Sequence, residues 1–274
     1  MIPLQYDLIH FIRQFVAESP LNRLKDIDDT PIWDEPLVGF VDGDDPLFAQ
    51  YKTVVGASHM TPREALRAPG GTAAEPARVG VVSWILPAAR ETRLSNRAMT
   101  AGPSLRWNHT RFQGEAFNEE LRRQVAGFLT ERGVFAVAPV LTTQFQTLRG
   151  EHGWASTWSE RHVAFAAGLG TFGLSDGLIS ARGIAHRCGS VVAAAAWTPS
   201  PRPYRGYRDY CADCASCIAR CPAGAISEQG HDKDKCRAFI FDTLAEWVKR
   251  PGYIGSYGAC GLCQTDVPCE FGIP

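Results

Sequence analysis

Cysteine spacing is the feature of this sequence that most directly indicates chemistry. Eight of the nine cysteines lie within residues 211–274, and four of them form the run Cys211-x2-Cys214-x2-Cys217-x3-Cys221, followed by Pro222. Three thiolates this close together can bind three irons of one cubic cluster, whereas the fourth reaches a second cluster. Structural zinc sites instead use paired knuckles with four ligands per ion. The spacing therefore favours iron–sulfur clusters over zinc.

The remaining cysteines complete the ligands that two four-iron clusters require. Cys236 is followed by Cys260-x2-Cys263-x5-Cys269, where the last gap is longer than the usual x3. Because the fourth cysteine of the first run ligates the other cluster, we predict two sets of ligands. One set is Cys211, Cys214, Cys217 and Cys269, and the other is Cys221, Cys236, Cys260 and Cys263. Cys221 and Pro222 are expected to open a helix, continued by residues 223–227.

Charge and composition exclude several classes of protein. The chain has 274 residues, with 28 Lys and Arg against 29 Asp and Glu, so its formal net charge is −1. This near-neutral charge excludes a protein that binds nucleic acid or anionic membranes through bulk charge. No apolar run reaches 18 residues, and the N-terminus lacks the features of a secretory signal. We therefore expect a cytoplasmic protein that does not associate with membranes and keeps its thiols reduced. Cys188, in an apolar strand, is expected to be a buried small hydrophobe.

Alternating helical and strand patterns before the cysteines predict an α/β or α+β core. We expect helices over residues 4–18, from Pro62 after the N-cap Thr61, over 113–132 and over 159–167. We expect strands over 79–86, 134–140, 178–181 and 189–197, the last two flanking one turn, and irregular structure over 26–60. The predicted organisation is an N-terminal region of residues 1–77 that packs on the core, the core of residues 78–203, and a cysteine module of residues 204–274.

Three glycines, Gly168, Gly170 and Gly173, form a Gly-x-Gly-x-x-Gly run around Leu169. A dinucleotide site would place such a run between a strand and a helix, but here it follows a predicted helix. The glycines could let the backbone approach another large ligand closely, or they could form a purely structural turn. Both interpretations stay open. Trp84, Trp107, Trp154 and Trp158 could likewise line a cavity or form ordinary core.

In combination, these motifs resemble the epoxyqueuosine reductase family, which is related to the reductive dehalogenases. The resemblance rests on Glu160-Arg161, the glycine run and the cysteine run, in that order over roughly residues 78–269. It implies a nitroreductase-like α/β core that binds a corrinoid (cobalamin), followed by a ferredoxin-like domain with two [4Fe–4S] clusters. The residues that it places near the corrinoid are Ser156, Thr157, Gly168, Leu169, Gly170 and Gly173.

The sequence departs from both relatives at the proton donor. Epoxyqueuosine reductases use an Asp shortly before the Glu-Arg pair, and this chain has no Asp between Asp45 and Asp176. The dehalogenases use a Tyr supported by a basic residue, and no Tyr occurs between residues 51 and 204. Because histidine titrates near neutral pH, the remaining candidates are His109, His152 and His162, each of which could equally be structural.

The resulting functional hypothesis is an iron–sulfur oxidoreductase that cleaves a small substrate reductively with cobalamin, fed with electrons by a ferredoxin or flavodoxin. The alternative is an electron-transfer protein without a corrinoid, whose core is a docking scaffold. A third hypothesis places a flavin where the corrinoid would bind. We expect no C-terminal helical extension like that of the tRNA-modifying enzymes, and the sequence has no surplus of basic residues. Both points disfavour a tRNA substrate without excluding it.

Overall fold

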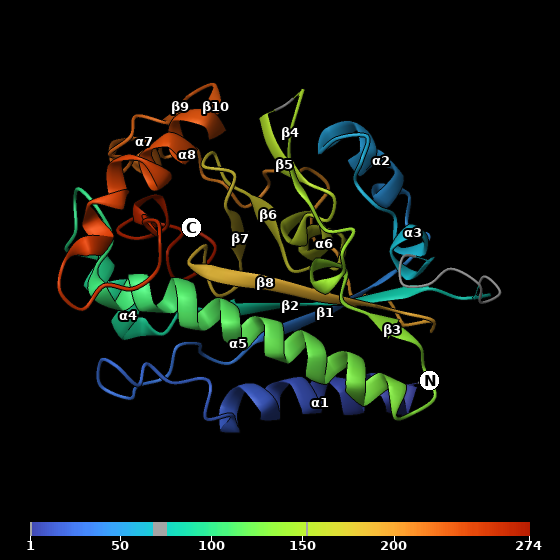
Figure 1. Cartoon of the computed structure of the whole chain (residues 1–274). Coiled ribbons are helices and arrows are strands. Elements are labelled where there is room, and N and C mark those ends of the chain that lie inside the picture. Colours follow the sequence, from blue (N-terminus) through green and yellow to red (C-terminus); the bar gives the residue numbers. More distant parts are fainter. Residues whose placement is uncertain (1, 68–75, 152) are drawn as a thin grey trace.

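The computed structural model describes residues 2–67, 76–151 and 153–274 (Figure 1). Its α-helices are α1 (Ile2–Glu18), α2 (Pro46–Val54), α3 (Pro62–Arg67), α4 (Arg90–Arg97), α5 (Leu105–Thr130), α6 (Glu160–Ala166), α7 (Ser216–Ala219) and α8 (Lys233–Phe241). Its strands are β1 (Leu37–Asp42), β2 (Gly80–Pro87), β3 (Ala136–Val137), β4 (Thr147–Gly150), β5 (Gly153–Ser156), β6 (Gly170–Phe172), β7 (Leu178–Ser180), β8 (His186–Ala193), β9 (Ile226–Ser227) and β10 (Gly230–His231).

An antiparallel sheet in the order β1-β2-β8-β3 forms the centre of the molecule. Every residue of β2 is buried, as expected for a continuous apolar run between two layers. The predicted strand over 79–86 is therefore confirmed. The strand predicted over 189–197 lies at His186–Ala193, because its register is set by pairing with β2, from Gly80↔Ala193 to Pro87↔His186.

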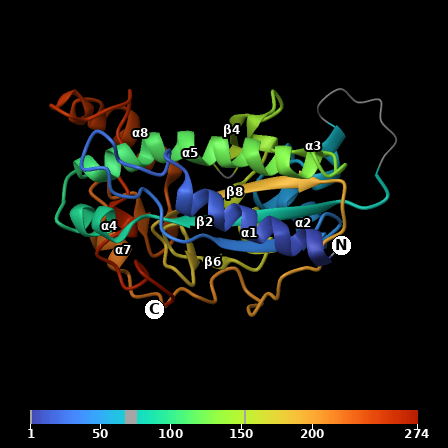
Figure 2. The same cartoon turned by 90° about the horizontal axis from the view of Figure 1, so that it is seen from below.

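Helices α1 and α5 cover one face of this sheet (Figures 1 and 2). Leu8 and Ile12 of α1 and Leu121 of α5 are fully buried against sheet residues such as Trp84. Helix α5 begins at Leu105 rather than near residue 113, after the N-cap Ser104, whose hydroxyl accepts from Trp107 N at 3.1 Å. Its first two turns lack the apolar stripe of the later ones because they contact the C-terminal segment instead of the sheet.

Helices α2, α3 and α6 cover the opposite face. The predicted N-cap is confirmed, since Thr61 N donates to Glu64 Oε2 at 2.7 Å and Glu64 N donates to Thr61 Oγ1 at 3.3 Å. The prediction of irregular structure over 26–60 was wrong in two places. Strand β1 pairs with β2 along its whole length, and Asp45 caps α2 by accepting from Leu47 N at 3.0 Å. The N-terminal region thus supplies a strand of the core sheet.

The two strands predicted around Arg182-Gly183 exist but do not pair with each other. β7 pairs with β6 in a small separate hairpin, whereas β8 pairs with β2 and β3. The glycine run itself supplies β6, which was not predicted because three residues with one glycine carry little periodic signal.

The C-terminal segment, residues 204–274, packs against α4 and the first half of α5 (Figure 1). The prediction of a helix that begins at Cys221 was wrong. The short helix α7 lies before Cys221, and the chain turns at Gly224, where φ is +56°, before entering β9. Among the described residues, no helix is both long and apolar enough to cross a lipid bilayer.

Candidate functional site

The eight C-terminal cysteines line two separate cavities, four to each. Cys211, Cys214, Cys217 and Cys269 line a cavity of about 20 Å³, which we call the outer cavity because Cys214 is exposed. Cys221, Cys236, Cys260 and Cys263 line a cavity of about 150 Å³, which we call the inner cavity. The structure therefore brings the cysteines together in the two groups that the spacing predicted.

The thiols within each group are close enough to affect one another's ionisation. Burial, followed by the neighbouring thiols Cys214, Cys217 and Cys211, raises the pKa of Cys269 to about 12. Burial, followed by Cys236 and Cys221, likewise raises the pKa of Cys260 to about 12. Grouped thiols of this kind release their protons when a positively charged metal centre binds them as thiolates.

Turns with left-handed residues wrap the chain around both cavities. Asp213 and Ala215 have φ values of +49° and +57° in the loop that carries the first three cysteines. In the inner group, Ala225 N donates to Cys221 Sγ at 3.3 Å. Gly261 has φ of +61°, and a Cβ there would lie 2.1 Å from the Trp107 ring. Only glycine therefore lets the loop between Cys260 and Cys263 lie this close to α5.

The donor sets suit clusters better than a single ion. Among the described residues, no three His, Cys, Asp or Glu side chains converge on one point as ligands of a lone metal ion do. Each set of four cysteines instead lines one cavity, and four thiolates are the number that one [4Fe–4S] cluster requires. Thiolates are also the ligands that iron–sulfur clusters require. The residues present therefore fit two clusters.

A third cavity, of about 320 Å³, adjoins the inner cavity and shares Ile240, Cys260, Gly261 and Gln264 with it. We call it the substrate-side cavity. It lies where the first half of α5, the start of β8 and the end of α8 meet. Its other lining residues are Trp33, Ala88, Trp107, Thr110, Arg111, His186, Arg187, Phe241, Tyr257, Gly258 and Ala259.

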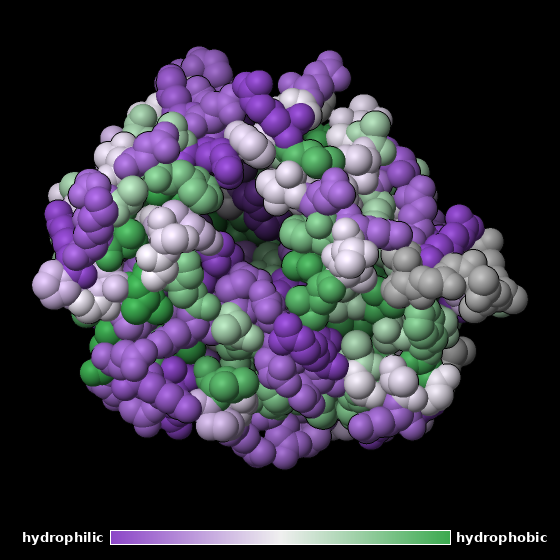
Figure 3. Space-filling view, in the orientation of Figure 1, coloured by the Kyte–Doolittle hydropathy of each residue, from purple (hydrophilic) through white to green (hydrophobic). Residues whose placement is uncertain are grey.

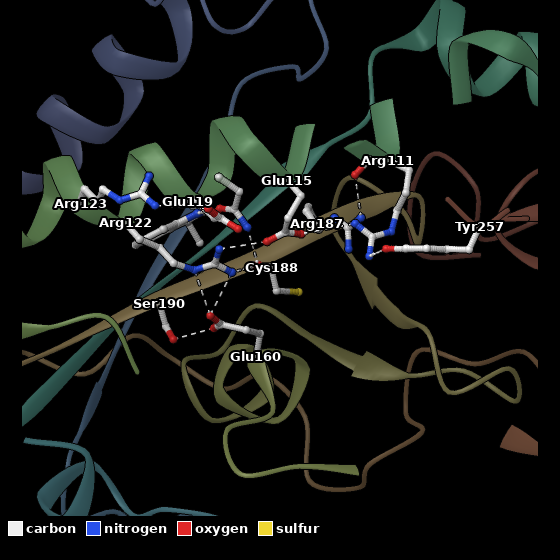
Figure 4. A network of polar contacts seen from close by, with 12 residues as sticks. Arg111, Glu115, Glu119, Arg122, Arg123, Glu160, Arg187, Cys188, Ser190 and Tyr257 are labelled. Atoms are coloured by element: carbon white, nitrogen blue, oxygen red, sulfur yellow. Dashed lines mark hydrogen bonds and ion pairs between the residues drawn. The ribbon is translucent and has the colours of Figure 1, made fainter. Parts of the chain in front are cut away.

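A chain of buried ion pairs runs from the core to this cavity (Figure 4). Glu160 accepts from Arg122 at 3.1 Å and from Ser190 Oγ at 2.5 Å. Arg122 also donates to Glu115 at 3.1 Å, and Glu115 lies 3.2 Å from Arg187 Nε. At the cavity end, Arg111 Nη2 donates to the Tyr257 hydroxyl at 2.8 Å. The network therefore holds Arg187 and Arg111 in place at the cavity wall.

Of the candidate proton-donor histidines, neither His109 nor His162 lines this cavity. His109 Nε2 is hydrogen-bonded to Gly252 O at 2.7 Å, where it joins α5 to the C-terminal segment. His162 packs among Tyr51 and Phe172, and burial lowers its pKa to about 3. His152 lies outside the described residues. The histidine that lines the cavity is His186, which sequence reasoning missed because a lone histidine opening a strand has no distinguishing motif.

The glycine run is packed against the chain's own backbone. A Cβ at Gly168 would lie 2.3 Å from Pro201 O, and one at Gly170 would lie 2.2 Å from Ile179 O. Gly168 also ends α6 with φ of +81°, and the amide of the following Leu169 donates to Ala164 O at 3.0 Å. These contacts account for both glycines without a ligand.

The other residues named by the resemblance are also dispersed. Gly173 lines the outer cavity. Ser156 Oγ donates to Trp158 O at 2.8 Å, and Thr157 Oγ1 donates to Gln144 O at 3.0 Å. Neither residue lines the substrate-side cavity. The prediction that these residues contact a corrinoid gains no support from their positions.

The four tryptophans considered from the sequence have different surroundings. Trp84 and Trp158 are core residues, whose indole N–H groups donate to Asn118 and Ser190, both at 2.9 Å. Trp154 lies under the guanidinium of Arg237, and Trp107 lines the substrate-side cavity. Cys188 is buried as predicted, and burial raises its pKa to about 12.

The surface is hollowed near the centre of the face shown in Figure 3. Comparison with Figure 1 places this hollow between the C-terminal segment and the β4–β5 hairpin. Contacts between Arg149 and Asp234, 2.7 Å apart, and between Arg237 and Trp154 join the two sides. Both hydrophilic and hydrophobic residues border the opening.

Comparison with known proteins identifies the fold. No protein-family model and no curated protein matches the sequence. An epoxyqueuosine reductase from Bacillus subtilis superposes with a TM-score of 0.53 and 18% identity, over 99% of this chain and 66% of that one. An epoxyqueuosine reductase solved with a tRNA-Tyr stem loop gives a TM-score of 0.50 and 16% identity, over 98% of this chain and 66% of that one.

A catabolic reductive dehalogenase gives a TM-score of 0.56 and 16% identity, over 86% of this chain and 30% of that one. This chain thus spans 66% of the length of the epoxyqueuosine reductases and a smaller part of the dehalogenase. The expected resemblance is confirmed at the level of the fold: over nearly its whole length the chain has the mixed α/β fold of epoxyqueuosine reductases and reductive dehalogenases, with a cysteine-rich C-terminal segment.

Proposed function

We propose that this protein is an iron–sulfur oxidoreductase in which two [4Fe–4S] clusters relay electrons to a small substrate in the substrate-side cavity. The observation that carries the proposal is the shared wall between that cavity and the inner cysteine cavity, which contains Cys260 itself. A ligand in the substrate-side cavity would therefore lie next to the inner cluster. The outer group, with the exposed Cys214, would receive electrons from a ferredoxin or flavodoxin in the cytoplasm.

The fold favours a reductase over a simple electron carrier, because the structural relatives are reductases. Fold likeness alone is a weak argument for a shared reaction. The cavity is the stronger argument, because an electron carrier needs no aromatic and cationic chamber beside its cluster. The electron-carrier alternative predicts that nothing binds in this chamber.

Cobalamin as a further cofactor rests on the fold alone. Gly168 and Gly170 face the chain's own backbone, and a cavity of about 320 Å³ is at the small end of ligand pockets, which span roughly 300–1,000 Å³. A whole corrinoid therefore does not fit the chamber as it stands, and we derive no step through it.

Tyr257 is the proposed proton donor in the chamber. Arginine has no acceptor, so the Tyr257 hydroxyl accepts from Arg111 and keeps its own proton for a bound ligand. The adjacent guanidinium would also stabilise the phenolate left after transfer. Two electrons from the clusters and this proton would convert a C–X bond into C–H and X⁻. Tyr257 and Arg111 thus provide a tyrosine and a basic residue, the combination expected from the dehalogenases. They lie at other positions in the chain than the dehalogenases would suggest.

The decisive experiment is metal and cofactor analysis of protein purified without oxygen. We expect about eight irons and eight acid-labile sulfides per chain, falling toward four irons in Cys214→Ala. A matched control is Cys188→Ala, which should keep all of the iron. Zinc without sulfide, or full iron in Cys214→Ala, would contradict the proposed ligands.

The same samples decide the question of the second cofactor. Titration with cob(II)alamin and with flavin mononucleotide, followed by gel filtration, measures whether either is retained by the holoprotein. Retention of one equivalent of cobalamin would support a corrinoid enzyme with an opened chamber, and retention of flavin would replace it. If the protein retains neither cobalamin nor flavin, the remaining possibility is direct reduction of the substrate beside the inner cluster.

A further inference from the structure

The two cysteine cavities differ in the charged residues of their walls. Arg161 and His231 line the inner cavity, and among its described lining residues there is no Asp or Glu. Asp213 lines the outer cavity, whose described lining residues include no Lys, Arg or His. Each cavity also has four cysteines, so the thiolates contribute equally to both. The difference between the two sites therefore comes from the other wall residues and from exposure to solvent.

One carboxylate lies close to the inner wall without neutralising it. Arg161 Nη1 donates to the backbone oxygen of Asp176, and Asp176 Oδ2 lies 3.5 Å from His231 Nδ1. Burial opposes ionisation of Asp176, but three basic neighbours hold its pKa below the ordinary value. These neighbours are His231, Arg161 and Lys233. Since Arg161 and Lys233 are both cations at pH 7, a positive charge remains here whatever the state of His231.

Two further carboxylates at the start of α8 already have partners. Asp234 Oδ2 lies 2.7 Å from Arg149 Nη2, and Asp232 Oδ2 lies 3.6 Å from Lys235 Nζ. Neither carboxylate lines the inner cavity. The charge of Arg161 therefore acts on the inner group of cysteines without a carboxylate in the same wall.

At the outer cavity a carboxylate takes the place that Arg161 has at the inner one. Asp213 accepts from Arg208, whose Nη2 also donates to Cys211 Sγ at 3.8 Å. This ion pair carries no net charge, and Asp213 rather than Arg208 is the member that lines the cavity. The outer cysteines therefore face a negative group in their wall and no unpaired cation.

Such charges change how readily an iron–sulfur cluster accepts an electron. Reduction adds a negative charge to a group that four thiolates already make negative, so a nearby cation favours the reduced state and a nearby carboxylate opposes it. Burial also opposes reduction, because a buried charge loses its stabilisation by water. Cys214 of the outer group is exposed, whereas the inner cysteines are all partly buried. Burial alone would therefore make the inner cluster the harder one to reduce.

We propose that Arg161 raises the reduction potential of the inner cluster above that of the outer cluster, whose potential Asp213 lowers. One electron then leaves the reduced outer cluster and reduces the oxidised inner cluster, with no bond made or broken and no proton transferred. The electron is thereby held beside the substrate-side cavity. This inference rests on the proposed function, because it assigns the direction of the relay to two residues outside the cysteines.

Redox titration of the cluster-loaded protein, followed by electron paramagnetic resonance, tests this inference without any turnover. We expect two one-electron steps, of which the one lost in Cys214→Ala belongs to the outer cluster and the other has the higher potential. In Arg161→Gln the inner step should move to more negative potential by at least a threefold change in the reduction equilibrium, where a tenfold change is about 59 mV. The outer step should stay in place. Arg161 is itself exposed, which limits the size of the shift.

Matched variants separate charge from other effects. Arg161→Lys keeps the charge and should keep the inner potential of the wild type. Asp213→Asn should raise the outer potential alone, and asparagine is tolerated at the φ of +49° found there. Arg123→Gln should move neither step, because Arg123 pairs with Glu119 and Glu120 on the exposed side of α5.

Iron and sulfide are measured in every sample, so that failure of this inference and failure of the proposed function are distinguishable. With full iron, an unchanged inner step in Arg161→Gln, an equal shift in Arg161→Lys, or an unchanged outer step in Asp213→Asn would overturn this inference alone. An outer cluster of higher potential in the wild type would do the same, even if a variant loses iron. Wild-type protein without clusters would overturn the proposed function.

Discussion

At the scale of single residues, the chemistry of this protein depends on a few side chains that the core holds in place. Glu160, the first residue of the Glu-Arg pair in the sequence, accepts from Arg122 and Ser190. Its role here is to anchor a network that ends at Arg187 and Arg111. Removing one member of a buried ion pair typically costs about 3–5 kcal/mol, because the remaining charge is left unpaired. The network therefore supports the cavity wall and also supplies its charged groups.

The proton-donor role of Tyr257 can be tested by Tyr257→Phe. Loss of a positioned proton donor typically lowers the rate about 10²–10⁴-fold. We expect a loss in that range for turnover of a reducible substrate, with cluster content and ligand affinity within about twofold of wild type. Rapid-mixing kinetics with dithionite-reduced protein measures the rate. A rate that is unchanged, or one that falls only together with ligand affinity, would exclude Tyr257 as the donor.

The buried histidines predict how stability depends on pH. Burial lowers the pKa of His162 to about 3 and that of His59 to about 4, from the ordinary value of about 6.5. The unfolded chain therefore binds more protons below pH 6.5, and the free energy of unfolding falls as the pH falls toward 4. Each histidine contributes a slope of up to about 1.4 kcal/mol per pH unit.

His162→Phe isolates this contribution, since it keeps an aromatic ring beside Tyr51 and Phe172. Urea unfolding of variant and wild type between pH 7 and pH 5 should show a shallower pH dependence in the variant. Exposed His10 serves as the control, because His10→Phe should leave the slope unchanged. Parallel curves for His162→Phe and wild type would show that His162 can be protonated in the folded state.

At the scale of elements, α5 is the part of the fold on which the site is built. Its later turns pack against the sheet, whereas its first turns carry Trp107 and Arg111 to the substrate-side cavity. Helix α5 also receives the C-terminal segment, because Asn108 Nδ2 donates to Ile254 O at 3.0 Å and Ile254 N donates to Asn108 Oδ1 at 2.8 Å. One helix therefore fixes the distance between the core and the cysteine cavities.

Gly261→Ala tests this close approach. The added methyl group would meet the Trp107 ring in a residue whose φ is +61°, so the loop between Cys260 and Cys263 must shift. We expect iron to fall toward four per chain, with loss of the inner cluster. Gly127→Ala, at a position in α5 with open space around the new Cβ, should instead stabilise the protein by about 1 kcal/mol. Full iron in Gly261→Ala would mean that the loop adapts without loss of its ligands.

At the scale of the whole molecule, the N-terminal region and the C-terminal segment both contact the core. β1 from the N-terminal region completes the sheet, and α4 receives the end of the chain. Buried Glu270 accepts from Arg97 Nε and from Asp266 N, each at 2.7 Å. The residue next to Cys269 is thereby tied to α4.

Glu270→Gln should therefore loosen the C-terminal segment. Hydrogen bonds to charged groups contribute about 1.5–3 kcal/mol, and we expect a loss of that size in the free energy of unfolding. Thermal unfolding followed by the cluster absorbance measures this loss together with release of iron. The exposed pair of Glu246 and Lys249 provides the control, since Glu246→Gln should change stability by less than about 0.5 kcal/mol. Equal stability of both variants would show that the Arg97 contact is dispensable.

Local sequence was sufficient for the features that depend on neighbouring residues. The spacing of the cysteines predicted both groups of four, because the fourth cysteine of a Cys-x2-Cys-x2-Cys-x3-Cys run ligates a different cluster from the first three. The capping box at Thr61, the buried strand β2 and the helix before the glycine run were predictable because they depend on residues that are neighbours in the chain. The helix at Cys221 failed because Gly224 turns the chain there. That the grouped cysteines bind clusters stays a prediction.

Only the tertiary structure decided what lies beside the inner cysteines. Arg111, Arg187 and Tyr257 come from α5, from β8 and from a loop after α8, and no local pattern marks any of them. They meet because the sheet register places the start of β8 beside α5 and because glycine at position 261 lets the last loop approach Trp107. Likewise, only the tertiary structure shows that Gly168 and Gly170 pack against the backbone of Pro201 and Ile179, and such close packing requires glycine as strictly as a cofactor would.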